Sequence, residues 1–79
     1  MKYRILYFAS LRDAAGHDSE EFASDAADAR TVYDELRRRH GFALAAERLR
    51  VAVNGEFASW SRPLADGDEI AFLPPVSGG

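Results

Sequence analysis

The last two residues of the chain, Gly78 and Gly79, can take part in chemistry although neither has a side chain. Because glycine lacks a Cβ, this pair can pass through a narrow channel and let its backbone approach a ligand closely. A terminal carboxylate can attack the α-phosphate of ATP to form an acyl-adenylate, and a sulfur nucleophile can then displace AMP to leave a thiocarboxylate. We therefore predict that Gly79 is the reacting residue and that Gly78 gives it access to a partner's active site.

The residues before this pair are predicted to hold it away from the folded body. Proline has no N–H to donate, so two prolines in succession cannot continue a sheet, and they favour an extended chain. Six extended residues reach about 20 Å, which is enough to enter a neighbouring active site. We predict a folded domain over 1–73 and a flexible tail over 74–79. The uncharged residues that lead to the glycine pair are Pro74, Pro75, Val76 and Ser77.

Outside the tail, the sequence has no residues at the spacing of a metal site or calcium loop. His17 and His40 stand far apart, without a cysteine or carboxylate cluster at ligand spacing, so no metal is expected. Asp66-Gly67-Asp68 lacks the rest of a calcium loop and predicts a plain turn. Both histidines are interpreted as surface or capping residues.

The composition excludes several classes of function. The 79 residues suffice for one small domain, and a hydrophobic fraction of 47% is typical of a globular chain. A net charge of -3 argues against nucleic-acid binding. The sequence has no cysteine, which fits a reducing compartment, and no signal-peptide layout or apolar run of membrane length. We expect a cytoplasmic protein that binds neither nucleic acid nor membranes.

One helix is predicted over 31–40. Thr31 is expected to cap it, and Gly41 is expected to end it. The basic run Arg37-Arg38-Arg39 is interpreted as a solvated face whose charge suits the carboxyl end of a helix. The alternative, a nucleic-acid patch, is disfavoured by the net charge.

Alternating and branched apolar residues predict strands on both sides of this helix. The segment 10–17 is predicted as a turn region that joins the first two strands into a hairpin. Asn54-Gly55 is typical of a tight turn between two later strands. The predicted strands cover 2–9, 18–24, 49–54, 56–58 and 69–73.

This order of elements resembles the β-grasp, or ubiquitin-like, arrangement. The resemblance implies an α+β fold with a mixed sheet of about five strands and one main helix across one face. In that fold the first and last strands lie side by side and parallel at the centre of the sheet.

One helix covers only one face of such a sheet, so the other face needs an explanation. Strand alternation places Phe8 and Leu73 on the uncovered face, and Phe57 on the short strand is expected to join them. An exposed apolar patch on a small protein usually marks a partner site. The alternative is that loops cover this face and make it core. The residues predicted beneath the helix are Ile5, Val51, Val53, Ile70 and Phe72.

Nearly the whole sequence resembles the small subunit of molybdopterin synthase, the sulfur carrier of molybdenum cofactor biosynthesis. The last two blocks that carry the resemblance are the most specific. Departures are minor: Leu73 stands where an aromatic residue is common, and Ser77 where threonine also occurs. The blocks are Leu6-Tyr7-Phe8-Ala9, Leu11-Arg12, Ala52-Val53-Asn54, Pro63-Leu64, Asp66-Gly67-Asp68-Glu69-Ile70-Ala71-Phe72 and Pro74-Pro75-Val76-Ser77-Gly78-Gly79.

The resemblance implies a carrier without catalytic residues of its own. An adenylating enzyme similar to ubiquitin-activating enzymes would use ATP to adenylate Gly79, and a sulfur donor protein would convert it to the thiocarboxylate. The carrier would then insert its tail into the large synthase subunit, which holds the active site, and pass sulfur to cyclic pyranopterin monophosphate. The active synthase would be a heterotetramer, and no cofactor would stay bound to the carrier. The implied partner contacts are Phe8, Phe57, Leu73, Pro74, Pro75, Val76 and Ser77.

Two other functions remain open from the sequence. One is a carrier for another pathway, such as thiamine thiazole synthesis, or a ubiquitin-like modifier. The other is a non-catalytic interaction domain that binds a partner through the apolar face of its sheet. Deletion of Gly78 and Gly79 separates the interaction domain from the other functions, because only carriers and modifiers need these two residues.

Overall fold

The computed structural model describes residues 1–75, which form a five-stranded mixed sheet and two helices. This confirms the predicted α+β, β-grasp fold, although a second helix accompanies the main one. The last two strands have the predicted bounds, and each of the other three is two residues shorter than predicted. The strands are β1 (Lys2–Tyr7), β2 (Ser19–Ala23), β3 (Arg50–Val53), β4 (Glu56–Ala58) and β5 (Glu69–Leu73).

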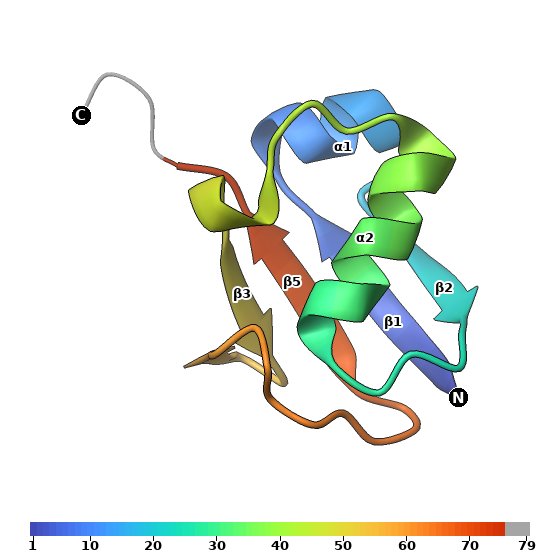
Figure 1. Cartoon of the computed structure of the whole chain (residues 1–79). Helices are drawn as coiled ribbons and strands as arrows, with labels where there is room; N and C mark the ends of the chain where they lie inside the picture. Colours follow the sequence, from blue (N-terminus) through green and yellow to red (C-terminus); the bar gives the residue numbers. More distant parts are fainter. Residues whose placement is uncertain (76–79) are drawn as a thin grey trace.

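The first and last strands pair in parallel near the centre of the sheet, as predicted (Figure 1). The strand order is β2-β1-β5-β3-β4, and all other pairs are antiparallel. In the central pair Ile5 lies beside Ile70 and Tyr7 beside Phe72. Because the two strands run the same way, β5 delivers the chain to the end of the sheet at which β1 also ends.

The main helix, α2 (Ala29–His40), lies across one face of the sheet (Figure 1). It begins two residues earlier than predicted, and its cap is Asp28 rather than Thr31. The Asp28 side chain accepts a hydrogen bond of 2.8 Å from the Thr31 backbone N–H, which otherwise has no partner within the first turn. The helix ends at Gly41, as predicted, and the Gly41 N–H returns to the Arg37 carbonyl at 2.8 Å.

A short helix, α1 (Ala9–Ala15), occupies most of the segment predicted as a turn region. That prediction is wrong because the helix buries one large apolar residue, with the small Ala15 partly buried against the core, so the sequence shows little helical repeat of apolar residues. Leu11 is its buried residue, and a shallow depression shared with residues 41–44 marks where α1 meets the chain that follows α2. In Figure 1, α1 lies at the end of the sheet where α2 also ends.

The core fills the space between α2 and the sheet face beneath it. Tyr33 of α2 lies near its centre, with its ring centroid 5.1 Å from that of Phe72 and 5.8 Å from that of Trp60. Trp60 in turn stacks on Phe72 with the ring planes 11° apart. All the residues predicted to lie beneath the helix are buried: Ile5, Val51, Val53, Ile70 and Phe72.

Asn54 joins two turns that are distant in the sequence. Asn54 and Gly55 have positive φ angles of 52° and 85°, which form the tight turn predicted between β3 and β4. The Asn54 side chain donates to Asp68 at 3.0 Å and accepts from the Glu69 backbone N–H at 3.0 Å. The β3–β4 turn is therefore tied to the predicted turn that begins β5.

Candidate functional site

The sheet face away from α2, called the outer face below, carries an apolar row. The row crosses β1, β5, β3 and β4 in one register, because each of its members lies beside the next across the strands. Phe8 and Leu73 extend it toward the end of the sheet where β5 ends. The members of the row are Leu6, Ala71, Ala52 and Phe57.

The structure places the three predicted contact residues on the outer face. Phe57 is 68% exposed and Phe8 is 42% exposed, while Leu73 is partly buried. Within residues 1–75, therefore, no loop covers these two phenylalanines, and the alternative that this face is core is wrong for them. The outward placement is confirmed, and the role of these residues in partner binding stays a prediction.

A groove lies where the tail begins. Its volume is about 620 Å³. Its walls are the end of β5 and the chain around a short 3-10 turn (Ala46–Arg48). The guanidinium carbon of Arg50 lies 5.0 Å from the ring centroid of Phe57 at the groove. Pro74 is partly buried and Pro75 is exposed. The groove is lined by Glu47, Arg48, Leu49, Arg50, Phe57, Leu73, Pro74 and Pro75.

The remaining predicted tail residues lie outside the described part of the chain. They are Val76, Ser77, Gly78 and Gly79. The structure therefore places the root of the predicted site and the face beside it, but not the predicted reacting end.

Sequence reasoning missed four residues that line this groove, Glu47, Arg48, Leu49 and Arg50, of which both arginines are exposed. A signal was present, because both arginines alternate with the buried residues Leu49 and Val51 and so lie on the opposite side of the chain. What the sequence did not provide is the register, in which Arg50 lies beside Leu73 at the end of β5.

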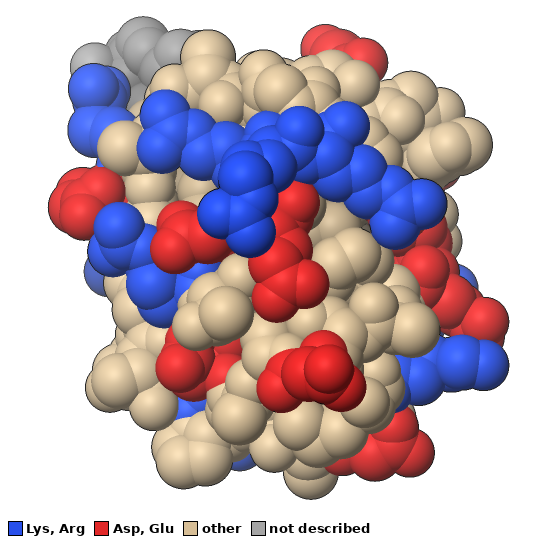
Figure 2. Space-filling model, turned by 45° about the vertical axis from the view of Figure 1, so that its right-hand side comes forward, with Lys and Arg blue, Asp and Glu red and all other residues tan. Residues whose placement is uncertain are grey.

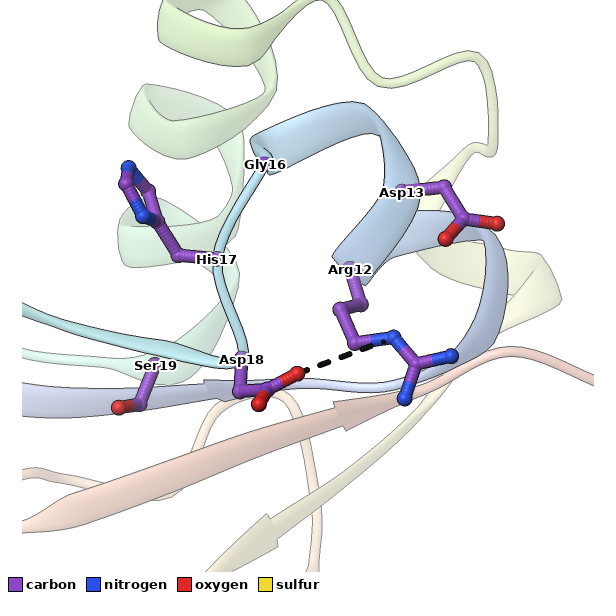
Figure 3. A pocket seen from close by; sticks show the side chains of 6 residues that line it. All are labelled: Arg12, Asp13, Gly16, His17, Asp18 and Ser19. Atoms are coloured by element: carbon purple, nitrogen blue, oxygen red, sulfur yellow. Dashed lines mark ion pairs between the residues drawn. The ribbon is translucent and has the colours of Figure 1, made fainter.

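A second depression, shown in Figure 3, lies between α1 and β2. Its lining is polar, and Arg12 and Asp18 point toward one another with Nε and Oδ1 3.8 Å apart. Both side chains are largely exposed, so this ion pair is worth little stability. His17 points away from the pair and is exposed, which confirms it as a surface residue.

His40 is a partly buried residue, and its interpretation as a surface or capping residue is wrong. Its side chain is 14% exposed, and its Nε2 atom lies 2.6 Å from Oε2 of Glu20. The same oxygen accepts a hydrogen bond of 2.5 Å from the Tyr7 hydroxyl. The three side chains therefore join β1, β2 and the end of α2 on the helix side of the sheet.

The environment of this cluster shifts two pKa values. Burial raises the pKa of Tyr7, and the hydrogen bond to Glu20 and the charge of Glu20 raise it further. For Glu20, burial alone would raise the pKa. The hydrogen bonds from Tyr7 and His40 and the positive charges of His40 and Arg39 together outweigh burial, and the pKa of Glu20 lies below its usual value. Glu20 is thus held as a carboxylate, in a structural role away from the outer face.

The described residues contain neither a metal-binding cluster nor a helix that could span a membrane. Over 1–75, histidine, aspartate and glutamate side chains form no group of three that could hold a metal ion. In the same part of the chain, neither helix has the length and apolar character needed to span a membrane.

Comparison with known proteins identifies the family. The chain matches the ThiS family over residues 5–79. It is 38% identical to the molybdopterin synthase sulfur carrier subunit of Escherichia coli (strain K12), over 96% of this chain and 98% of that protein.

Solved structures share the fold of this chain. SAMP1 from Haloferax volcanii has a TM-score of 0.83 and 30% identity, over 100% of both chains. A chain in the complex of subunits 1 and 2 of molybdopterin-converting factor from Helicobacter pylori has a TM-score of 0.70 and 25% identity, again over 100% of both chains. The chain belongs to the ThiS family, among the molybdopterin synthase sulfur carrier subunits.

Proposed function

We propose that this chain carries sulfur as a thiocarboxylate on Gly79 and delivers it within molybdopterin synthase. As a sulfur carrier subunit it serves molybdenum cofactor biosynthesis. One observation supports the chemistry most directly: β5 ends beside the exposed apolar face, so a partner seated on that face lies next to the root of the tail. The residues after Pro75 then need only continue outward to reach the partner's interior.

Each step of the proposed cycle uses the carboxylate and no side chain of the carrier. A carboxylate oxygen of Gly79 attacks the α-phosphorus of ATP, and pyrophosphate leaves. Hydrosulfide supplied by a donor protein then attacks the acyl carbon and displaces AMP, which leaves the thiocarboxylate. Inside the large subunit the thiocarboxylate sulfur bonds to a carbon of cyclic pyranopterin monophosphate, and water then hydrolyses the resulting thioester, so that the sulfur stays on the pterin and Gly79 returns as a carboxylate. ATP belongs to the activating enzyme in this scheme, and the carrier retains no cofactor.

The outer face is proposed as the docking surface for both protein partners. Phe8, Phe57 and Leu73 supply exposed or partly exposed apolar area next to the tail root, which suits association with a protein. In the Helicobacter pylori structure, a similar chain is part of a complex of subunits 1 and 2 of molybdopterin-converting factor. Because both partners would use the same face, the large subunit and the adenylating enzyme are expected to exclude one another. The carrier would therefore leave the large subunit before it is loaded with sulfur again.

The test is an intact mass spectrum after incubation with the adenylating enzyme, ATP and a sulfur source. Replacement of one oxygen by one sulfur, located on Gly79 by fragmentation, would support the carrier function. An unchanged mass would refute it, provided that the same enzyme preparation loads a known carrier. Incubation without ATP is the control for adventitious sulfur.

A ubiquitin-like modifier is a second candidate, favoured by one observation. SAMP1 of Haloferax volcanii has the same fold over its full length, and another structure of that organism is described as small archaeal modifier protein 1. A modifier would form an amide bond between Gly79 and a lysine of a target. After ATP-dependent activation in a cell extract, a modifier gives covalent conjugates of higher mass, whereas a sulfur carrier gives the thiocarboxylate of the free chain.

A further inference from the structure

Two arginines flank the root of the tail without a carboxylate to balance them. Arg48 and Arg50 line the groove that contains Pro74 and Pro75, and both are exposed. Among residues 1–75, no aspartate or glutamate forms an ion pair with either arginine. Glu47 stands next in the sequence, but its carboxylate pairs with Arg30 at 3.2 Å.

The charge at this end of the molecule is opposite in sign to that of the whole chain. The chain has a net charge of -3. The last turn of α2 nevertheless carries Arg37, Arg38 and Arg39. Further along the chain, Arg48 ends the 3-10 turn and Arg50 begins β3. Figure 2 shows Lys and Arg side chains gathered in a band across the upper part of the molecule, with most Asp and Glu side chains on that face below it. Such an uneven distribution creates a local positive potential that can orient an approaching partner.

The position of the two arginines along the chain limits what they can contact. Gly79 is the fourth residue after Pro75, a span of roughly 14 Å for an extended chain. With the tail extended into a partner, Arg48 and Arg50 would not reach the phosphates at the reacting carboxylate. They would lie instead where the tail enters the partner's channel.

One of the two arginines is also held against the outer face. The guanidinium of Arg50 lies over the ring of Phe57, with its carbon 5.0 Å from the ring centroid. This contact favours a position of the charge beside an exposed aromatic residue of the proposed docking surface. An acidic side chain on the partner would meet Arg50 at the edge of the apolar contact.

We propose that Arg48 and Arg50 form an arginine collar that steers the tail into an acidic channel rim on the adenylating enzyme. This inference rests on the proposed carrier function. Electrostatic complementarity raises association rates more than it raises affinity. That effect suits the activating enzyme, from which the carrier departs once it is loaded. With the large subunit a lasting complex is needed instead, as in the Helicobacter pylori complex of subunits 1 and 2, and there the apolar outer face supplies the contact area.

The test compares two charge-reversal variants that change the net charge equally. Arg48→Glu/Arg50→Glu alters the collar. Lys2→Glu/Arg38→Glu is the control, since Lys2 begins β1 at the far end of the sheet and Arg38 is exposed on α2, the layer opposite the outer face. The association rate constant with the adenylating enzyme is measured by stopped flow at low and high salt, after thermal melting establishes that both variants fold.

The collar variant is expected to associate about tenfold more slowly than wild type at low salt and to lose most of the salt dependence. The control should remain within about threefold of wild type, because steering acts through charges near the contact. Equal slowing of the two variants would overturn the collar and leave only an effect of net charge.

A conservative variant sharpens the result. Arg48→Lys/Arg50→Lys keeps both charges but loses the bidentate fork, so steering predicts an association rate close to that of wild type. A loss as large as in the glutamate variant would contradict steering. Failure of the proposed function is distinguishable, because then wild type itself would gain no sulfur on Gly79 while the association rates could still differ.

Discussion

Oε2 of Glu20 lies 2.6 Å from Nε2 of His40 and links the second strand of the sheet to the last residue of its main helix. We expect Glu20→Gln to lower the free energy of unfolding at pH 7 by about 1–2 kcal/mol, because hydrogen bonds to a charged group are the stronger ones. The pKa of Glu20 lies below its usual value in the fold, so the stability it contributes is present above that usual value. It is lost as the pH falls through the lowered pKa.

Urea denaturation of wild type and Glu20→Gln over a series of pH values from 7 downward measures this dependence. The difference in stability between the two proteins should persist below the usual glutamate pKa and shrink only as the pH falls through the lowered pKa of Glu20. A difference that stays constant across this range would mean that the side chain contributes through packing rather than through its charge.

Phe57→Asp should separate partner binding from folding. Phe57 is 68% exposed, so its replacement should change the free energy of unfolding by no more than about 0.5 kcal/mol. A carboxylate in the middle of an apolar contact should weaken binding to the large synthase subunit at least about tenfold. Calorimetric titration with that subunit and thermal melting of the free chain give the two quantities.

Phe72→Ala is the matched contrast on the same sheet. Phe72 is fully buried between Tyr33 and Trp60, so its truncation should cost about 3–5 kcal/mol of stability. If Phe57→Asp destabilised the chain as much as Phe72→Ala does, the outer face would be part of the folding core and not a binding surface.

Asn54→Ala should destabilise the chain by about 2 kcal/mol. The substitution removes two side-chain hydrogen bonds that join the β3–β4 turn to the start of β5, and it places alanine at a φ of 52°. Replacement by glycine restores the conformational freedom but not the hydrogen bonds. Chemical denaturation of Asn54→Gly should therefore give an intermediate value, and equal losses in the two variants would assign the whole effect to the hydrogen bonds.

Deletion of Gly78 and Gly79 should abolish sulfur loading without changing the melting temperature. The described part of the fold ends at Pro75, before these residues, whereas the proposed chemistry depends on them. Gly79→Ala separately tests whether the partner's channel is narrow, since this variant keeps the terminal carboxylate but adds a Cβ. Sulfur loading of this variant should fall strongly. Full loading of either variant, seen as sulfur incorporation in the intact mass, would move the reacting group away from Gly79.

The sequence could predict the strands and the two faces of the sheet because period-two alternation is a local signal. Phe8 and Phe57 were placed outward and Phe72 inward by this signal, and the structure agrees. The parallel pairing of β1 with β5 came instead from resemblance to a known fold, since alternation alone does not state which strands are neighbours.

The features that sequence reasoning missed depend on contacts between distant segments. The burial of His40 is set by Glu20 and Tyr7, which lie on other elements. The short helix α1 has no capping side chain at Phe8, so its start carries no capping signal in the sequence. The start of α2 was misplaced because Asp28 and Thr31 are both residue types that cap helices, so the sequence offered two possible starts. In the structure the helix starts after Asp28, and its first residue, Ala29, is buried.

The parallel pairing of β1 and β5 also separates the chain's one side-chain amine from its tail. Lys2 is the single lysine, and it begins β1, at the end of the sheet where β5 also begins. Pro74 leaves from the other end, roughly 20 Å along the strands. The basic groups beside the tail root are the guanidiniums of Arg48 and Arg50, which are poor nucleophiles. The surface around the tail root therefore carries no lysine that could attack an activated acyl group on Gly79. This arrangement disfavours acylation of the carrier by its own activated end.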